Sequence, residues 1–308
     1  MYYFHRLICL LTVLGFSSSA AISQEKATPQ KRAPQLSPTY ANIKYGQHER
    51  NVLDFWAAQG DKPHPLAIYI HGGGFVGGDK SSINANMLND LLNAGISVAA
   101  INYRFVQHAP LPAAHDDSVR AIQFLRSKSQ EWNIDKNRIG GFGGSAGAQL
   151  VMYLAFHDDQ ADPKSNDPLR RESTCLCCVA PNAGQVTMDL SWWAKNIPGF
   201  TKSEHNLKRM FGVETDEAVL QKNASIAALS LIKKSAPPVF MTYAMAPDAK
   251  VPADEASRRT WIVHHVANGI ELKKTCDQLG VEAYLTYPGA KARYASAIDF
   301  LKAKLLSQ

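Results

Sequence analysis

The sequence predicts an α/β domain with a mostly parallel central sheet, helices on both faces and a small helical cap insertion. Short, wholly apolar segments such as "LAIYI" and "SVAAI" alternate with amphipathic segments of helical length. Strands of this kind are typical of parallel sheets that are covered by helices on both faces. With 308 residues, of which 45% are hydrophobic, the chain has enough apolar material for one large core.

The N-terminus has the pattern of a secretory signal peptide. A short first region is followed by the apolar run "LICLLTVLGF" and the small residues "SSSAA". We expect residues 1–23 to be removed, and the location to be secreted or periplasmic; a retained signal anchor is the alternative. The apolar run is too short to cross a bilayer, so we expect no stable membrane span after cleavage.

The charges of the chain give no sign of a nucleic-acid partner. The net charge is +6, and removal of the leader takes away Arg6 and no acidic residue, which leaves +5. The charged residues are scattered, without a basic run or interleaved aromatic residues. A mildly basic surface is therefore favoured over a nucleic-acid site.

The elements follow in order along the chain. Residues 24–38 are polar and rich in proline, which predicts a flexible lead-in to a domain over 39–308. An opening β-hairpin is expected from "ANIKYG" and "RNVLDFWAA". Periodicity and turn residues then predict strands at 65–70, 96–104, 138–143, 175–184, 237–244 and 281–288, and helices at 83–95, 112–132, 145–157 and 264–280, with a closing helix that ends near 306.

Residues 187–236 interrupt this alternation. Their text is helical and aromatic, as in "LSWWAKNIPGF" and "HNLKRMFG". We interpret the segment as a cap inserted over the carboxyl edge of the sheet. Trp192 and Trp193 are candidates for lining a substrate pocket there, although burial in the core of the cap is the favoured alternative.

The cysteines are not spaced like metal ligands. After the leader the chain keeps Cys175, Cys177, Cys178 and Cys276. "TCLCCVA" alternates like a buried strand, so we expect these cysteines to act as small core residues. One disulfide, to Cys276, remains open in an oxidising compartment.

"GGSAG" at 143–147 fits G-x-S-x-G and lies between a predicted strand and a predicted helix. That context is required for a nucleophile elbow, a turn so tight that only small residues can flank the serine. Ser145 is therefore the predicted nucleophile. A structural glycine turn is the alternative.

"HGGG" at 71–74 ends an earlier strand. Glycines allow backbone N–H groups to approach a developing oxyanion, so Gly73, Gly74 and the N–H of Ala146 are the predicted oxyanion hole. The motif lacks the lysine and Ser/Thr of a phosphate-binding loop. His71 is expected to shape the loop.

These two motifs, together with "NYR", "PAA" and "DKNRI" between them, resemble the α/β-hydrolase family, in particular its lipase and esterase branch with HGGG loops. That branch includes hormone-sensitive-lipase-like and feruloyl-esterase-like enzymes. The resemblance covers about residues 40–308 and is most specific between 65 and 155. It implies an ester hydrolase with a Ser-His-acid triad and no cofactor.

The resemblance also implies where the acid lies. "PDAKVP" after the strand at 237–244 is similar to the D-x-x-V-P turn of the family, which makes Asp248 the candidate acid. Asp254 and Glu255 are nearby competitors.

The base departs from the family pattern. Where members of the family usually have a histidine after "YPGA", this chain has Lys291, Ala292 and Arg293. The remaining candidates are His264 and His265, expected at the start of a helix whose N-terminus would keep an imidazole neutral. Only one of two adjacent residues can face the serine, and we favour His264. A surface or capping pair is the alternative.

These residues favour a secreted serine carboxylesterase or lipase-like hydrolase. Its expected partner is a small ester, free or carried by a lipid or polysaccharide, and no metal or organic cofactor is implied. The alternative is a catalytically degenerate relative that binds a glycan or a lipid, and a peptidase of similar fold is a weaker third. Acyl length and oligomeric state do not follow from the sequence.

Overall fold

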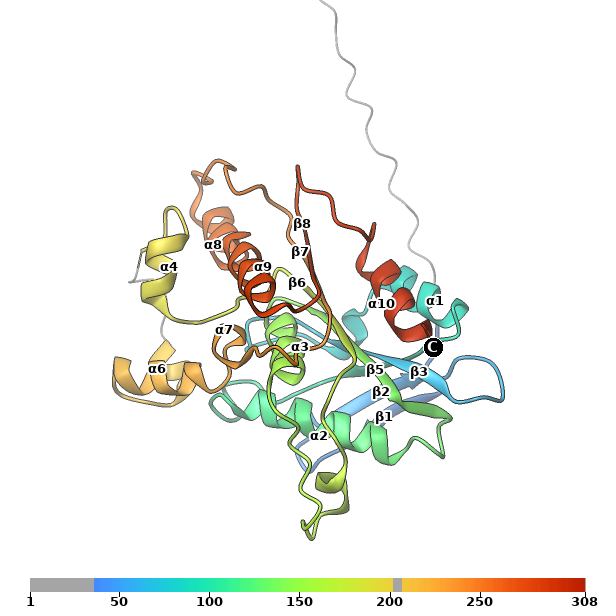
Figure 1. Ribbon diagram of the computed structural model, residues 1–308. Helices are drawn as coiled ribbons and strands as arrows, with labels where there is room; N and C mark the ends of the chain where they lie inside the picture. Colours follow the sequence, from blue (N-terminus) through green and yellow to red (C-terminus); the bar gives the residue numbers. More distant parts are fainter. Residues whose placement is uncertain (1–35, 202–206, 308) are drawn as a thin grey trace, which may run out of the picture. The chain divides into compact units, whose positions relative to one another are not determined.

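One eight-stranded sheet organises the part of the chain that the computed structural model describes, residues 36–201 and 207–307 (Figure 1). The order of the strands is β1-β2-β4-β3-β5-β6-β7-β8. Their bounds are β1 Tyr40–Lys44, β2 Val52–Trp56, β3 His64–Ile70, β4 Ser97–Ile101, β5 Ile134–Gly144, β6 Cys178–Asn182, β7 Val239–Thr242 and β8 Ala283–Thr286. The predicted signal peptide and the lead-in up to residue 35 lie outside the described residues.

The pairing of the strands confirms the predicted sheet. β1 and β2 form the expected antiparallel hairpin, and β2 pairs antiparallel with β4. All the other pairs, from β4–β3 to β7–β8, are parallel. The carboxyl ends of β3, β5 and β6 therefore meet at one edge, where ligands bind in open α/β sheets.

Helices cover both faces of the sheet (Figure 1). Alternation along β4 shows the two layers: Val98 and Ala100 pack into a core with α1 and α10, whereas Ala99 and Ile101 belong to the core on the side of α2, α3 and α9. The bounds are α1 Ala85–Asn93, α2 Ala113–Ser127, α3 Ala146–Phe156, α9 Ala267–Leu279 and α10 Ala297–Leu306. Two 3₁₀ turns, η1 Lys80–Ser82 and η2 Pro168–Arg171, complete the connections of this part.

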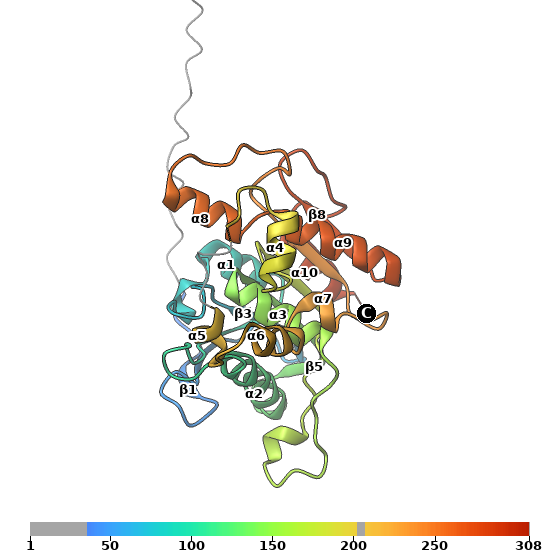
Figure 2. The same cartoon turned by 90° about the vertical axis from the view of Figure 1, so that its left-hand side faces the viewer.

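The segment predicted as a cap contains four described helices, α4 Leu190–Asn196, α5 Leu207–Phe211, α6 Asp216–Ala224 and α7 Ala228–Leu231. Figure 2 shows α4, α5 and α6 on the side toward the viewer, together with α8 (Glu255–Val263). Trp193 and Ile197 of α4 pack with Trp261 and Ile262 of α8 in a small separate core. The cap segment thus packs against α8, which follows β7 in the chain.

Two expectations about the elements are wrong. No separate helix was expected before residue 264, but Asp254 accepts a hydrogen bond from the N–H of Ser257 (2.9 Å) and begins α8. His264 is consequently the residue that ends α8, three residues before α9 begins. The apolar character of Trp261, Ile262 and Val263 extends the helix up to the histidine.

The second correction concerns the cysteines. β6 begins only at Cys178, and Cys175 is exposed, so the buried strand is shorter than expected. Cys178 and Cys276 are buried, but they belong to the cores on opposite faces of the sheet. The cysteines of the described chain are all free thiols.

Candidate functional site

A strained turn holds Ser145 between β5 and α3. The residue has φ 54° and ψ −119°, outside the regions that L-residues ordinarily adopt. The flanking glycines explain why the turn holds: a Cβ on Gly143 or on Gly147 would lie 2.4 or 2.0 Å from the carbonyl oxygen of Ile70. The N–H of Ser145 also donates to Asn182 O at 2.9 Å. Only glycine therefore fits at positions 143 and 147, two residues to either side of the serine, as the motif predicted.

His264 lies opposite the serine. Its Nε2 is 2.9 Å from Ser145 Oγ, which is hydrogen-bonding distance. Burial lowers the pKa of His264 below its ordinary value, while the backbone carbonyl of Thr260 acts in the opposite direction. A ring kept neutral at pH 7 can accept the proton of the hydroxyl. The cause is burial at the C-terminal end of α8, and not a helix N-terminus as the sequence had suggested.

His265 points elsewhere. It is 2% exposed, its Nδ1 accepts a hydrogen bond from the N–H of Ala267 (3.2 Å), and its ring lies 4.4 Å from that of Trp261. These contacts attach it to the beginning of α9. Of the two candidate bases, the structure brings His264 to Ser145 and places His265 in a capping position.

The candidate acids do not contact the imidazole. Asp248 is exposed in the loop after β7, and within residues 36–201 and 207–307 it makes no hydrogen bond or ion pair. Asp254 caps α8 through Ser257, and Glu255 is exposed in the first turn of that helix. The structure therefore brings two members of the predicted triad together. Asp248 lies apart from them, and its role as the acid stays a prediction from the sequence.

The glycine loop lies beside the serine. Gly73 and Gly74 have φ values of 111° and 60°, and a Cβ on Gly73 would lie 2.1 Å from Gly77 O. In the described chain their N–H groups donate to no other group. Ala146 begins α3, where N–H groups lack an intrahelical partner. These three donors are the ones that an oxyanion hole requires.

One arginine that the sequence analysis did not identify supports this loop. Arg50 donates from Nη2 to Gly78 O (3.0 Å) and to His71 Nε2 (3.3 Å), and from Nε to Tyr103 O (2.8 Å). Because arginine only donates, His71 Nε2 must accept and its Nδ1–H donates to Gly72 O at 2.7 Å. Burial lowers the pKa of His71 to about 4. His71 thus shapes the loop, and no motif pointed to Arg50.

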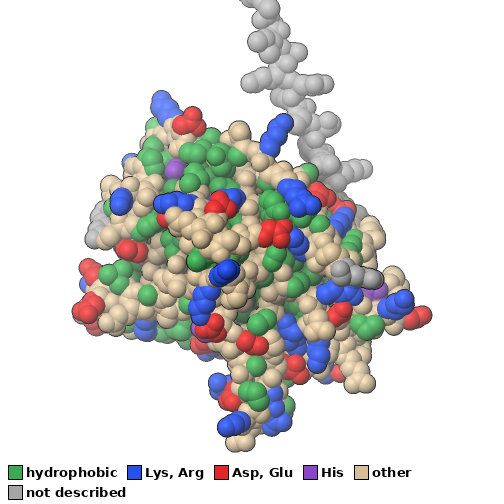
Figure 3. Space-filling view, viewed as in Figure 1, with side chains coloured by type: hydrophobic (Ala, Val, Ile, Leu, Met, Phe, Trp, Pro, Cys, Tyr) green, Lys and Arg blue, Asp and Glu red, His purple; other side chains and the backbone are tan. Residues whose placement is uncertain are grey.

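An apolar cavity of about 190 Å³ opens above Ser145. Trp193 lines it, whereas Trp192 is not among the lining residues; the indole Nε1 of Trp193 donates to Thr187 O at 2.8 Å. The glutamines Gln149 and Gln185 are its main polar side chains besides the serine. The other lining residues are Gly74, Phe75, Met188, Leu190, Leu207, Met210 and Val263. The face of the molecule that Figure 3 shows carries charges of both signs, interspersed rather than clustered.

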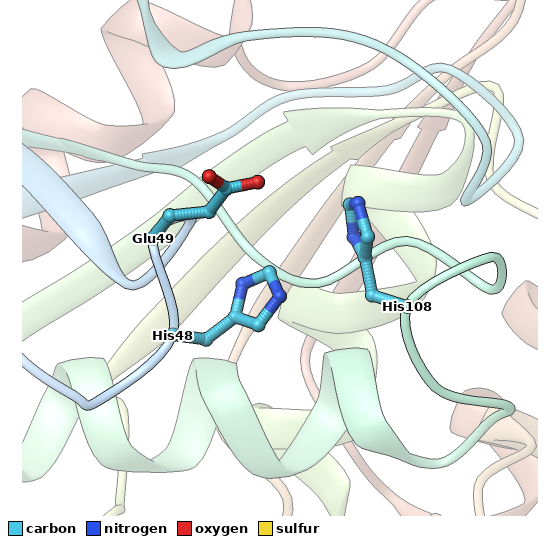
Figure 4. Close-up of side chains that lie close together, drawn as sticks. All are labelled: His48, Glu49 and His108. Carbon is cyan, nitrogen blue, oxygen red and sulfur yellow. The ribbon is translucent and has the colours of Figure 1, made fainter.

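A group of possible metal ligands lies outside the set of residues that line the cavity. The ligand atoms of His48, Glu49 and His108 lie within 4.8 Å of one another (Figure 4). Each imidazole Nδ1 accepts a backbone N–H at 3.1 Å, from Arg50 for His48 and from Phe105 for His108. Metal-binding histidines usually donate their second ring nitrogen to an acceptor, whereas here that nitrogen faces a donor. We therefore assign no metal to this group.

Within residues 36–201 and 207–307, no helix is both long and apolar enough to cross a bilayer.

Comparison with known proteins places the chain in a family. The BD-FAE family model matches residues 53–259, more than half of the chain. The match includes the glycine loop and Ser145 and ends before His264. His264, the candidate base, thus lies outside the part of the chain that the family model matches.

Two curated relatives are similar over shorter stretches. "Probable carboxylesterase 2" of Arabidopsis thaliana is 33% identical over 103 residues, 32% of this chain and 33% of that protein. "Ethyl acetate hydrolase" of Pseudomonas putida is 34% identical over 88 residues, 29% of this chain and 28% of that protein. The chain spans about a third of the length of the curated relatives it matches.

Among solved structures, a truncated form of a carbohydrate esterase from gut microbiota is similar with a TM-score of 0.70 and 20% sequence identity. The similarity covers 89% of this chain and 99% of that one. At this level of identity it shows the fold, which is the α/β-hydrolase fold.

Proposed function

This chain belongs to the BD-FAE family, in the esterase and lipase branch of the α/β-hydrolases, and we propose that it is a secreted serine carboxylic ester hydrolase. The observation that carries the proposal is the 2.9 Å contact between Ser145 Oγ and His264 Nε2. The contact lies on a nucleophile elbow, beside free backbone N–H groups and below an apolar cavity. Nucleophile, base, oxyanion donors and a binding space are the components of acyl transfer.

The proposed reaction has two halves. Ser145 Oγ attacks the ester carbonyl while His264 Nε2 takes the hydroxyl proton, and the negative oxygen is bound by the N–H groups of Gly73, Gly74 and Ala146. The intermediate expels the alcohol, which receives the proton from His264, and leaves an acyl group on Ser145. Water then attacks this acyl group with His264 again as the base, which releases the acid. These reaction steps need no cofactor.

The substrate that we propose is a small carboxylic ester. The apolar cavity above Ser145 suits an acyl chain, because burial of apolar surface favours binding. The names of the relatives, a carboxylesterase, an ethyl acetate hydrolase and a carbohydrate esterase, support esters of simple alcohols or of sugars. An ester carried by a lipid or a polysaccharide also satisfies this chemistry.

The test is turnover of p-nitrophenyl acetate and p-nitrophenyl butyrate by the chain without residues 1–23. We expect hydrolysis, and covalent labelling by a fluorophosphonate that is lost in Ser145→Ala. A folded protein that is neither labelled nor active would contradict the esterase proposal. The absence of a carboxylate contact to His264 in the described chain would then favour the non-catalytic alternative, a glycan-binding or lipid-binding relative.

We also propose that the protein is secreted or periplasmic, a proposal that is independent of the activity. It rests on the pattern of residues 1–23, which resembles a secretory signal peptide. N-terminal sequencing of the protein from the periplasm or the culture medium should give a first residue between Ala21 and Gln24. An intact Met1 in the cell pellet would contradict it.

A further inference from the structure

The base of this site lacks the support that usually orients it. In a Ser-His-acid triad a carboxylate holds the imidazole, but in the described chain no carboxylate contacts His264. His264 also lies at the junction of α8 and α9, where two helices end and begin within three residues. Another contact must fix this junction relative to Ser145.

Two glutamines form that contact. Gln149 Nε2 donates to Gln185 Oε1 at 2.7 Å, and Gln185 Nε2 donates to Val263 O at 2.7 Å. Gln149 lies one turn after Ser145 on α3, and its N–H donates to Ser145 O at 3.1 Å. Val263 directly precedes His264. The two hydrogen bonds therefore connect the helix of the nucleophile with the residue next to the base.

The orientation of the Gln185 amide is unambiguous. Its Nε2 lies 2.7 Å from Val263 O and 3.2 Å from Ala183 O, and both of these atoms can only accept. Its Oε1 therefore faces Gln149, whose Nε2 must be the donor. All the polar atoms of this amide are in use, so its side chain has one favourable position.

Burial makes these bonds costly to break. Gln185 is 5% exposed and lines the cavity together with Gln149, Ser145 and Val263. Because the rest of that cavity is apolar, a broken bond leaves a buried polar group without a partner, which is unfavourable. The bridge therefore favours one position of the junction that carries His264.

We propose that Gln149 and Gln185 are positioning residues that hold His264 Nε2 against Ser145 Oγ, in place of an orienting carboxylate. This inference rests on the proposed esterase activity. The glutamines act on the backbone before His264, whereas an acid would act on the ring itself. Neither residue touches the reacting atoms in this scheme.

The test uses replacements that preserve size. Gln185→Met removes both bonds of the bridge, Gln185→Asn is one methylene too short to span it, and Gln149→Met removes only the first bond. Gln123→Met is the matched control, because Gln123 is also buried (2% exposed) and also donates from Nε2 to backbone carbonyls, those of Glu172 (3.1 Å) and Arg170 (3.4 Å). Those carbonyls belong to the segment around η2, outside the cavity.

The substrate is p-nitrophenyl acetate, whose acyl group occupies little of the cavity. We expect kcat to fall about 10-fold to 10²-fold in both Gln185 variants and less in Gln149→Met, since a small misplacement of a catalytic group costs up to about 10²-fold. KM should change little, and Gln123→Met should keep the wild-type kcat. Thermal unfolding shows which variants are folded. If neither Gln185 variant folds, the kcat of Gln149→Met provides the test.

A double-mutant cycle separates positioning from general loosening of the site. When His264 is already replaced by alanine, Gln185→Met should cause no further loss of the residual rate of fluorophosphonate labelling. An equal loss in both backgrounds, or wild-type kcat in folded Gln185→Met, would overturn the bridge and leave the esterase proposal intact. A wild-type protein without turnover would instead contradict the esterase proposal.

Discussion

At the scale of single residues, the candidate site joins one strained serine with one histidine from the end of α8. Ser145 keeps an unfavourable backbone conformation because its glycine neighbours pack against Ile70 O with no room to relax. Strain of this kind persists only where the surrounding structure enforces it. His264 needs no strain, because the end of α8 delivers it directly to the hydroxyl.

Replacing each histidine separately tests which is the base. His264→Ala should lower kcat by about 10²-fold to 10⁴-fold, the usual contribution of a general base. His265→Gln should keep kcat near the wild-type value and lower only the melting temperature, because His265 contacts Ala267 and Trp261 rather than the serine. The reverse pattern in the kinetics would show that the assignment is wrong.

Asp248→Asn tests the predicted acid. Loss of a triad acid costs about 10⁴-fold in kcat. Because the Asp248 carboxylate is exposed and has no partner among the residues described, we expect kcat to stay within about 10-fold of the wild-type value. A loss as large as that of a triad acid would mean that the loop after β7 closes on His264 during catalysis.

At the scale of elements, the glycine loop that follows β3 is held by residues from outside it. Glycines 72–74 have no side chains with which to fix their own conformation. Tyr103 donates from its hydroxyl to His71 O (2.9 Å), and Arg50 binds His71 at the beginning of the loop and Gly78 at its end. The guanidinium of Arg50 also lies 3.8 Å above the ring of Phe105.

Arg50→Met should therefore loosen the glycine loop, and with it the proposed oxyanion hole. We expect kcat to fall between about 10-fold and 10³-fold, the upper value corresponding to the loss of one oxyanion donor. Arg120→Met is the control, since Arg120 also binds a backbone carbonyl, that of Tyr45 (2.9 Å), away from the loop. Equal losses of kcat in both variants would show that Arg50 acts only through general stability.

At the scale of the whole molecule, the packing of the core bears on two properties. The cavity bears on the acyl chain that fits, and two buried histidines bear on stability in acid. The cavity takes its walls from α3, from the loop after β3 and from the cap segment, which includes Trp193, Leu207 and Met210. His71 and His115 are both fully buried. The arrangement of the layers thus determines both the length of acyl chain that fits and the stability in acid.

The volume of the cavity predicts an acyl preference. The lining of the cavity is almost wholly apolar. Each methylene buried against it contributes about 0.8 kcal/mol, so kcat/KM should rise by up to about fourfold per methylene beyond acetate and reach a maximum at the chain length that fills the cavity. Met188→Trp should move this maximum to shorter chains. A maximum at acetate in the wild-type protein would contradict the prediction.

Acid should destabilise the fold through its buried histidines. Burial lowers the pKa of His115 from 6.5 to about 3 and that of His71 to about 4. Between these values and 6.5 the unfolded chain binds protons that the folded chain does not, so stability is lost as the pH falls below about 6.5. His115→Phe, which preserves ring contacts with Phe75 and Tyr153, should make the melting temperature less dependent on pH.

A buried ring of the same helix provides the control for that measurement. Phe124→Leu removes no titratable group, so it should leave the slope of melting temperature against pH between pH 4 and 6.5 unchanged. An unchanged slope in His115→Phe as well would show that His115 does not contribute to acid lability.

Much of the fold and part of the site could be predicted because local patterns determine them. Wholly apolar strands that alternate with helices indicate a covered parallel sheet, and this sheet is present. The G-x-S-x-G turn could be assigned because only glycine fits at Gly143 and Gly147, where the turn passes close to Ile70 O. In both cases the physical requirement acts on neighbouring residues of the chain.

The sequence by itself therefore determined the sheet, the serine turn, the glycine loop and the two histidines that are candidates for the base. Only the tertiary structure decided that α8 ends at His264, that Asp248 is exposed, and which groups Arg50 and the two glutamines contact. These contacts join residues far apart in the chain, and they depend on where packing places each helix end. No local pattern in the sequence encodes such a distance.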